Sequence, residues 1–297
     1  MRIRRMVGVG LTFLIGLLAM LPVLMLIQIR YPPAVDSPYT PADFALSYTE
    51  ETFTTSDGVS LSGWFIPRRG YESDAVTEHP TIVLLHGWPA DKGNILPLFP
   101  SLAEEYNLFL FDFRGLGESE RVLSTVGVRE QKDARAALDL LEEKYGIREV
   151  GLWGFSMGGA VALMVASDER VRAVASHSSY ASLSDMANEL YPFPGFRYPL
   201  GFLTRLYVTI LWGVDTRDAS PEQVVGSLDI PLLLSHSVDD RAIPVSHGRR
   251  LARAVSENDS VELWFPSGGH GYLPSGYEER VREFFDAVFY SEPYVFR

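Results

Sequence analysis

Residues 152–160, LWGFSMGGA, place Ser156 among glycines where a run of large apolar side chains gives way to small ones. Residues 149–155 predict a buried strand, and residues 158–167 predict a helix of small side chains. A serine between them must sit in a sharp, strained turn, beside neighbours without a Cβ that let strand and helix pass closely. This stretch therefore requires a strand, a tight turn and a helix in immediate succession.

Gly154, Ser156 and Gly158 fit the pattern G-x-S-x-G, which a plain glycine-rich turn also satisfies. A position directly after a strand and directly before a helix is the setting of a nucleophile elbow. The N terminus of the helix would there offer unpaired N–H groups and the positive end of its dipole to an oxyanion. In this context Ser156 is a candidate nucleophile.

The rest of the chain alternates strands and helices. Residues 52–67 predict a hairpin around the Asp57-Gly58 turn. Further strands are expected at residues 81–85, 107–113, 171–176, 231–235 and 261–265, and helices at residues 128–145, 245–255 and 277–289. The alternation predicts an α/β fold with a mostly parallel central sheet flanked by helices. Such sheets bind ligands beyond the carboxyl ends of their strands.

A serine hydroxyl needs a base to accept its proton, and histidine is the usual one. In a site of this kind the partners follow in the order serine, acid, histidine. His270 satisfies the order and lies in a glycine-rich loop after the last strand, whereas His177 and His236 end strands and are the alternatives. The remaining histidines lie before the first parallel strand, in the loop after it or in a predicted helix: His79, His86 and His247.

Two adjacent aspartates, Asp239 and Asp240, follow the strand at residues 231–235 and compete for the role of the acid. Either could instead only cap a helix. The oxyanion would need two backbone N–H groups, one from Met157 after the nucleophile and one from the loop after residues 81–85. Trp88 can supply the second, whereas Pro89 has no N–H.

Five motifs in the same order resemble those of the α/β-hydrolases over about residues 50–290. They are HGWP at 86–89, DFRGLGES at 112–119, GFSMGG at 154–159, HSVDDRAIP at 236–244 and the loop of His270. The fourth resembles H-G-x-x-D-x-x-V-P, which places the acid on Asp240, with Ser237 in place of the usual glycine. The resemblance implies an α/β-hydrolase fold at residues 50–297 with a short lid insertion at about 178–228.

The chain is most similar to the branch of monoglyceride lipases, small esterases and membrane-associated depalmitoylases. That implies a serine hydrolase that cleaves carboxylic esters or thioesters through an acyl-enzyme, with Ser156, Asp240 and His270 as catalytic residues. The alternatives are an aminopeptidase-like serine peptidase acting on short peptides and an inactive, membrane-tethered binding protein. The aromatic stretch within the insertion either only packs over the sheet or also lines a pocket for an apolar, lipid-like acyl substrate.

The first thirty residues form a separate segment, with no charged side chain from Met6 to Ile29. A helix of that length would rise about 36 Å, enough to cross a hydrocarbon core of roughly 30 Å. We expect an uncleaved transmembrane anchor at residues 1–30, with a cytoplasmic N terminus and an extracytoplasmic catalytic domain, since arginines dominate its start. A cleaved signal peptide and a buried helix are the alternatives. Residues 31–49 would be a proline-rich tether.

Charge and composition exclude several classes of function. Residues 31–297 carry 22 of the 26 basic and all 38 acidic side chains, so they would repel nucleic acid. The chain has no cysteine, which excludes disulfides, thiolate metal sites and a cysteine nucleophile. No dinucleotide fingerprint or metal-ligand cluster is present in the sequence, so we expect neither a cofactor nor a metal.

Overall fold

The computed structural model describes residues 2–30, 32, 35, 37–70 and 73–290. Its centre is an eight-stranded sheet in the order β1-β2-β4-β3-β5-β6-β7-β8. The strands are β1 (Thr49–Thr54), β2 (Ser60–Ile66), β3 (Thr81–Leu85), β4 (Asn107–Phe111), β5 (Val150–Phe155), β6 (Val171–His177), β7 (Leu232–Ser235) and β8 (Val261–Trp264). The β1–β2 and β2–β4 pairs are antiparallel, and the pairs from β4 to β8 are parallel.

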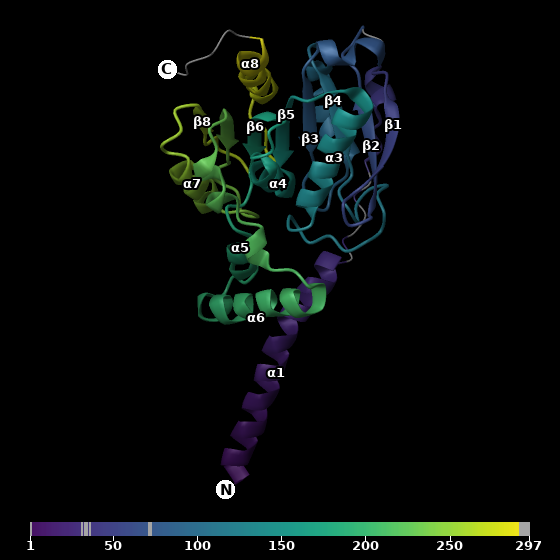
Figure 1. Ribbon diagram of the computed structural model, residues 1–297. Coiled ribbons are helices and arrows are strands. Elements are labelled where there is room, and N and C mark those ends of the chain that lie inside the picture. Colours follow the sequence, from purple (N-terminus) through teal and green to yellow (C-terminus); the bar gives the residue numbers. More distant parts are fainter. Residues whose placement is uncertain (1, 31, 33–34, 36, 71–72, 291–297) are drawn as a thin grey trace.

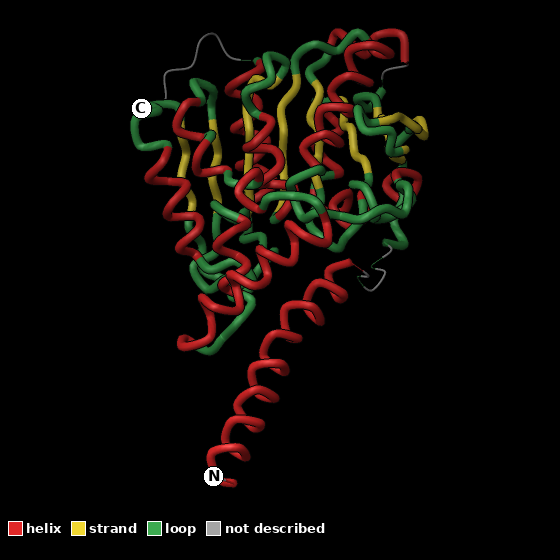
Figure 2. The backbone as a smooth tube through the Cα atoms, turned by 60° about the horizontal axis from the view of Figure 1, so that its bottom comes forward, coloured by secondary structure: helices red, strands yellow, loops and turns green. Residues whose placement is uncertain are grey.

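Helices lie on both faces of this sheet (Figures 1 and 2). The α-helices are α1 (Arg2–Arg30), α2 (Lys92–Ile95), α3 (Glu130–Tyr145), α4 (Met157–Val165), α5 (Leu183–Glu189), α6 (Pro194–Trp212), α7 (Val245–Ala254) and α8 (Tyr277–Phe289). Short 3-10 helices occur at Pro41–Phe44, Ser73–Glu78, Leu96–Leu98, Pro100–Glu104, Thr216–Asp218, Pro221–Gln223 and Val225–Ser227. The predicted mostly parallel sheet flanked by helices is confirmed.

Alternate residues of the central strands enter two separate cores. In β3, Val83 and Leu85 pack with α3, α4 and α7, whereas Ile82 and Leu84 pack with α8 and the segment around Phe99. All four β3 side chains are essentially inaccessible to water. A strand buried on both faces reads as a continuous apolar run, and this explains why TIVLL is recognisable in the sequence.

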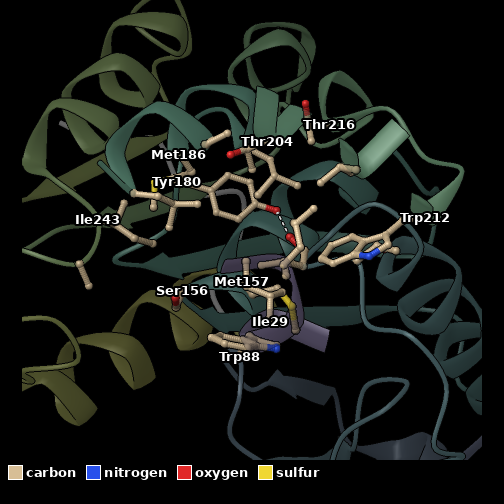
Figure 3. A pocket seen from close by; sticks show the side chains of 18 of the residues that line it. Ile29, Trp88, Ser156, Met157, Tyr180, Met186, Thr204, Trp212, Thr216 and Ile243 are labelled. Atoms are coloured by element: carbon tan, nitrogen blue, oxygen red, sulfur yellow. Dashed lines mark hydrogen bonds between the residues drawn. The ribbon is translucent and has the colours of Figure 1, made fainter. Parts of the chain in front are cut away.

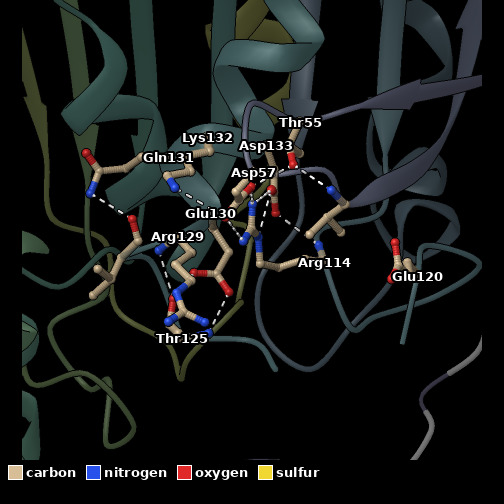
Figure 4. Close-up of polar contacts among 12 residues, drawn as sticks. Thr55, Asp57, Arg114, Glu120, Thr125, Arg129, Glu130, Gln131, Lys132 and Asp133 are labelled. Carbon is tan, nitrogen blue, oxygen red and sulfur yellow. Dashed lines mark hydrogen bonds and ion pairs between the residues drawn. The ribbon is translucent and has the colours of Figure 1, made fainter. Parts of the chain in front are cut away.

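A buried ion cluster joins the β1–β2 turn to α3, next to the carboxyl end of β4 (Figure 4). The Arg114 guanidinium donates to Asp133 through Nε at 2.8 Å and to Asp57 through both terminal nitrogens at 2.9 Å. These hydrogen bonds from Arg114 hold the pKa of Asp57 well below its usual range. Arg114 and Asp133 are both buried, and removing one partner from a buried ion pair typically costs about 3–5 kcal/mol. The segment DFRGLGES is thus a structural turn that fixes the β1–β2 turn of the hairpin against α3.

The insertion at residues 178–228 holds α5, α6 and three short 3-10 helices. Sequence periodicity did not predict α6, because Pro199 lies inside it and prolines flank its start. Trp212 ends the helix, and Gly213 follows it with φ of 67°. Ser220 precedes the three-residue 3-10 helix Pro221–Gln223.

Helix α1 leads away from the sheet, and its C-terminal end lies against α6 (Figures 1 and 2). Within the described part of the chain, no helix combines the length and apolar character needed to cross a membrane. The transmembrane anchor predicted at residues 1–30 therefore gains no support from the structure. Part of the predicted tether, at residues 31, 33–34 and 36, lies outside the described residues. Its remainder contacts the domain, since the Ser37 N–H donates to Asp91 at 2.7 Å.

Candidate active site

Ser156 occupies the turn between β5 and α4 with φ of 54° and ψ of −116°, a strained conformation for a residue other than glycine. The neighbouring glycines make this turn possible. A Cβ on Gly158 would lie 2.2 Å from the Leu85 carbonyl oxygen, and one on Gly154 would lie 2.4 Å from the Gly158 carbonyl oxygen. The G-x-S-x-G pattern is therefore required by packing as well as by the position of the serine.

His270 lies beside the Ser156 hydroxyl, carried by the loop after β8. Its Nε2 is 3.1 Å from Ser156 Oγ, and its Nδ1 is 2.7 Å from Asp240 Oδ2. An ionised carboxylate only accepts, so Nδ1 carries a proton and Nε2 is free to accept the proton of the serine. The Phe155 ring packs against the imidazole with centroids 4.9 Å apart, which helps to fix its orientation.

Asp240 is held by more than its histidine. Its Oδ1 accepts hydrogen bonds from the Ala242 and Ile243 N–H groups, both at 2.9 Å, and its carboxylate is inaccessible to water. Burial alone would raise the pKa of Asp240, but the hydrogen bonds from His270 and Ile243 outweigh it and lower that pKa. The carboxylate therefore stays ionised at neutral pH, as an acid that orients an imidazole must.

Asp239, the competing aspartate, points elsewhere. It is exposed, and its carboxylate accepts the Gly268 N–H at 3.2 Å. Among the hydrogen bonds of the described residues, none joins Asp239 to His270. The structure thus brings Asp240, and not its neighbour, to the imidazole.

The other histidines near the strand ends have partners of their own. His177 Nδ1 lies 2.8 Å from Ser235 Oγ, and burial lowers the pKa of His177 to about 3. His236 donates through Nε2 to the Ile243 carbonyl at 2.8 Å, while His86 accepts the Phe113 N–H at 3.0 Å. Among the described side chains, none of these three imidazoles forms a hydrogen bond with the Ser156 hydroxyl, whereas His270 does.

Trp88 and Met157, the two predicted oxyanion donors, both lie at the cavity that contains Ser156. Met157 opens α4, so its N–H is one of the unpaired donors of a helix N terminus. Trp88 directly follows Gly87. A Cβ added to Gly87 would lie 3.1 Å from Ser156 Cβ, so the backbone of the Gly87–Trp88 segment passes close to the serine. Within the described residues, neither N–H donates to another backbone group, which leaves both available for a substrate oxygen.

A cavity of about 320 Å³ opens at Ser156 and His270 (Figure 3). Its walls come from the loop of Trp88, the segment Thr125–Val126, the start of α4, helices α5 and α6, the end of α1, and the loops that carry Tyr180, Thr216 and Ala242–Ile243. The lining residues are Leu26, Ile29, Trp88, Thr125, Val126, Ser156, Met157, Tyr180, Leu183, Met186, Ala187, Leu190, Thr204, Val208, Trp212, Thr216, Ala242, Ile243 and His270. In the described part of the chain, no group of three or more histidine or acidic side chains is placed to hold a metal ion.

One buried acid that the sequence did not single out shapes this cavity. Glu130 accepts the Thr125 N–H at 2.7 Å, the Thr125 hydroxyl at 2.8 Å and the Gly127 N–H at 2.8 Å. Val126 between them has φ of 55°, strained for a β-branched residue. Glu130 thus holds a strained loop against the pocket. The only sequence signal was an acid at a helix start, which ordinarily indicates nothing more than a cap.

Residues 80–214 match the family model described as alpha/beta hydrolase fold. The uncharacterized protein YfhR of Escherichia coli is 30% identical over 241 residues, covering 79% of this chain and 77% of its own length. The lysophosphatidylserine lipase ABHD12 of Danio rerio is 25% identical over 255 residues, covering 78% of this chain and 65% of that protein. The solved structure of the Pyrococcus furiosus esterase Pf2001 superposes with a TM-score of 0.69 at 26% identity, covering 86% of this chain and 98% of that one.

Proposed function

Since the chain belongs to the α/β-hydrolase superfamily, we propose that it is a serine hydrolase that cleaves carboxylic ester or thioester bonds. The observation that carries the proposal is the hydrogen-bonded series from Ser156 Oγ through His270 to the buried carboxylate of Asp240. This is the arrangement that converts a weak hydroxyl nucleophile into an effective one.

In the proposed reaction, Ser156 attacks the acyl carbonyl while His270 accepts its proton through Nε2. His270 then donates that proton to the departing alcohol or thiol, and Asp240 stabilises the imidazolium in between. The N–H groups of Trp88 and Met157 bind the oxyanion of each tetrahedral intermediate. Water deprotonated by His270 finally attacks the acyl-enzyme, which releases the acid and regenerates the serine.

Two independent features support an ester with an apolar acyl group as the substrate. The cavity at Ser156 is lined almost entirely by apolar side chains, as in pockets that bury a hydrocarbon ligand. Two of the similar proteins are described as an esterase and as a lysophosphatidylserine lipase. A lipid-like carboxylic ester therefore agrees with both the cavity and the comparisons.

A substrate panel tests the choice of reaction. We expect hydrolysis of p-nitrophenyl acyl esters and acyl thioesters, and reaction of Ser156 with a fluorophosphonate probe. We expect turnover of aminoacyl p-nitroanilides to be at least about a hundredfold slower, because the cavity offers few polar partners for a peptide. Faster turnover of the anilides would instead favour the peptidase alternative, and failure of the probe to label would favour an inactive protein.

We further propose that α1 attaches the protein to a membrane and that the catalytic domain lies on the extracytoplasmic side. The support comes from the uncharged run at Met6–Ile29, the arginines before it and the apolar side chains that α1 exposes. Those exposed side chains are Met6, Phe13, Leu17, Met20, Leu24 and Ile27.

Membrane attachment predicts that alkaline carbonate leaves the full chain in the membrane pellet. Leu17→Asp combined with Leu24→Asp should release it, because each charge would be costly to bury in hydrocarbon. Protease added outside intact cells stripped of their wall should digest the catalytic domain. Release of the unaltered chain by carbonate would contradict attachment, and protection of the domain from external protease would contradict its placement.

A further inference from the structure

One wall of the cavity is formed by the amino-terminal helix α1, which precedes the hydrolase domain in sequence. Leu26 and Ile29 of α1 line the same space as Ser156 and His270. Figure 3 shows the side chain of Ile29 beside the same cavity as Trp88, Met157 and Trp212. A segment that precedes the first strand of the sheet by about twenty residues thus lines the same cavity as the candidate nucleophile.

The contact between α1 and α6 is a packed one. Leu26 is 3% exposed and forms an apolar cluster with Val208, Trp212 and Val214, against which Ile29 also packs. The α6 end of this cluster is held to the domain, because Arg129 Nη2 donates to the Trp212 carbonyl at 2.9 Å. The wall built by α1 therefore has a defined position relative to Ser156.

Polar groups around the cavity are mostly satisfied by the protein itself. The Tyr180 hydroxyl donates to the Val126 carbonyl at 2.8 Å, and Thr204 Oγ1 donates to the Leu200 carbonyl at 2.9 Å. Among the described side chains that line the cavity, the Trp88 indole N–H is the one buried polar group without a partner. An occupant of the inner cavity consequently meets hydrocarbon, with little to recognise in a peptide or a sugar.

We propose that Leu26 and Ile29 are specificity-determining residues that contact the acyl chain of the substrate, so that α1 forms part of the acyl-binding site. This inference rests on the proposed function, and it narrows the substrate class to esters of unbranched acyl chains long enough to pass from Ser156 to α1. Each methylene buried against this wall contributes about fourfold in binding. We therefore expect long-chain esters to depend on α1 more strongly than acetate, which buries few carbons.

The test compares two tryptophan variants on neighbouring positions of α1, in the full chain. Leu26→Trp fills part of the cavity and should lower the laurate-to-acetate ratio of kcat/KM for p-nitrophenyl esters about tenfold. Ile27→Trp is the matched control, because Ile27 is 51% exposed and does not line the cavity. It should leave the ratio unchanged. Equal ratios for the wild type and both variants, or equal losses in both variants, would overturn the inference.

A second variant keeps the test decisive if tryptophan disrupts packing. Leu26→Ala enlarges the cavity and should raise the palmitate-to-laurate ratio of kcat/KM, a change in chain-length preference that general destabilisation does not produce. An unchanged preference would contradict the inference.

Binding separates this inference from the proposed reaction. If the wild type hydrolysed no ester, the proposed function would fail. An anthroyloxy-labelled stearic acid should still bind to the chain, and Leu26→Trp should weaken that binding about tenfold relative to Ile27→Trp. Absence of binding, or equal binding by both variants, would reject the role of α1.

Discussion

Replacing Ser156 by alanine should lower kcat for a p-nitrophenyl ester on the order of 10⁴- to 10⁶-fold. The substitution removes the only atom that attacks the substrate, whereas the oxyanion donors and the cavity remain and supply the residual rate. Labelling by a fluorophosphonate probe should disappear. The fold should survive, because alanine retains the Cβ that already tolerates φ of 54° at this turn.

Ser179→Ala provides the matched control for this variant. Ser179 is also buried, and its hydroxyl accepts a hydrogen bond from Ser176 at 2.9 Å rather than one from Ser156 or His270. Its loss should change kcat only a few-fold, while thermal unfolding reports the folded state of both variants. Wild-type turnover by Ser156→Ala would remove the basis of the proposed mechanism.

The central sheet could be predicted because its strands carry strong local signals. The run TIVLL matches β3 at residues 81–85, and the Asp57-Gly58 turn joins β1 to β2. The order of the strands could not be predicted, since it depends on pairings between residues far apart. Local pattern also failed at α6, where Pro199 contradicts a helix that tertiary packing nevertheless stabilises.

The residues of the candidate site also differ in how far they could be predicted from the sequence. Ser156 and His270 could be singled out because each stands in a local setting that suits its role, a tight turn and a glycine-rich loop. Asp239 and Asp240 could not be separated on local grounds, because adjacent residues share nearly the same sequence environment. The motif resemblance selects Asp240, and the fold agrees with that choice, because it buries the Asp240 carboxylate against His270 and leaves Asp239 exposed.

The contribution of α1 to the cavity could not be predicted from the sequence. An uncharged run predicts burial in some apolar medium, but it does not tell lipid from protein. Leu26 and Ile29 line the cavity, whereas the side chains of Leu24 and Ile27 are more than half exposed. Different sides of α1 therefore lie in different environments. A hydropathy pattern does not distinguish them, because it counts only how apolar each residue is.

Exchange of the acid provides the second decisive comparison, between Asp240→Asn and Asp239→Asn. In the first variant, the new asparagine would lack the charge that stabilises the imidazolium. Its amide could also donate to His270 Nδ1 and leave Nε2 protonated, unable to accept from Ser156. We therefore expect Asp240→Asn to lower kcat about 10⁴-fold. Raising the pH should not restore activity, because an amide cannot ionise.

Asp239→Asn is the control that the chain itself offers, one residue away with the same change in charge. Its carboxylate accepts one exposed hydrogen bond from Gly268, so we expect kcat to fall only a few-fold. Steady-state kinetics on one ester, with circular dichroism to verify folding, decides between them. A larger loss for Asp239→Asn would assign the acid to the exposed residue, and equal small losses would show that His270 acts without a carboxylate. The expected difference follows from burial: Asp240 is ionised and inaccessible to water, so neither solvent nor salt can replace its charge beside the imidazole.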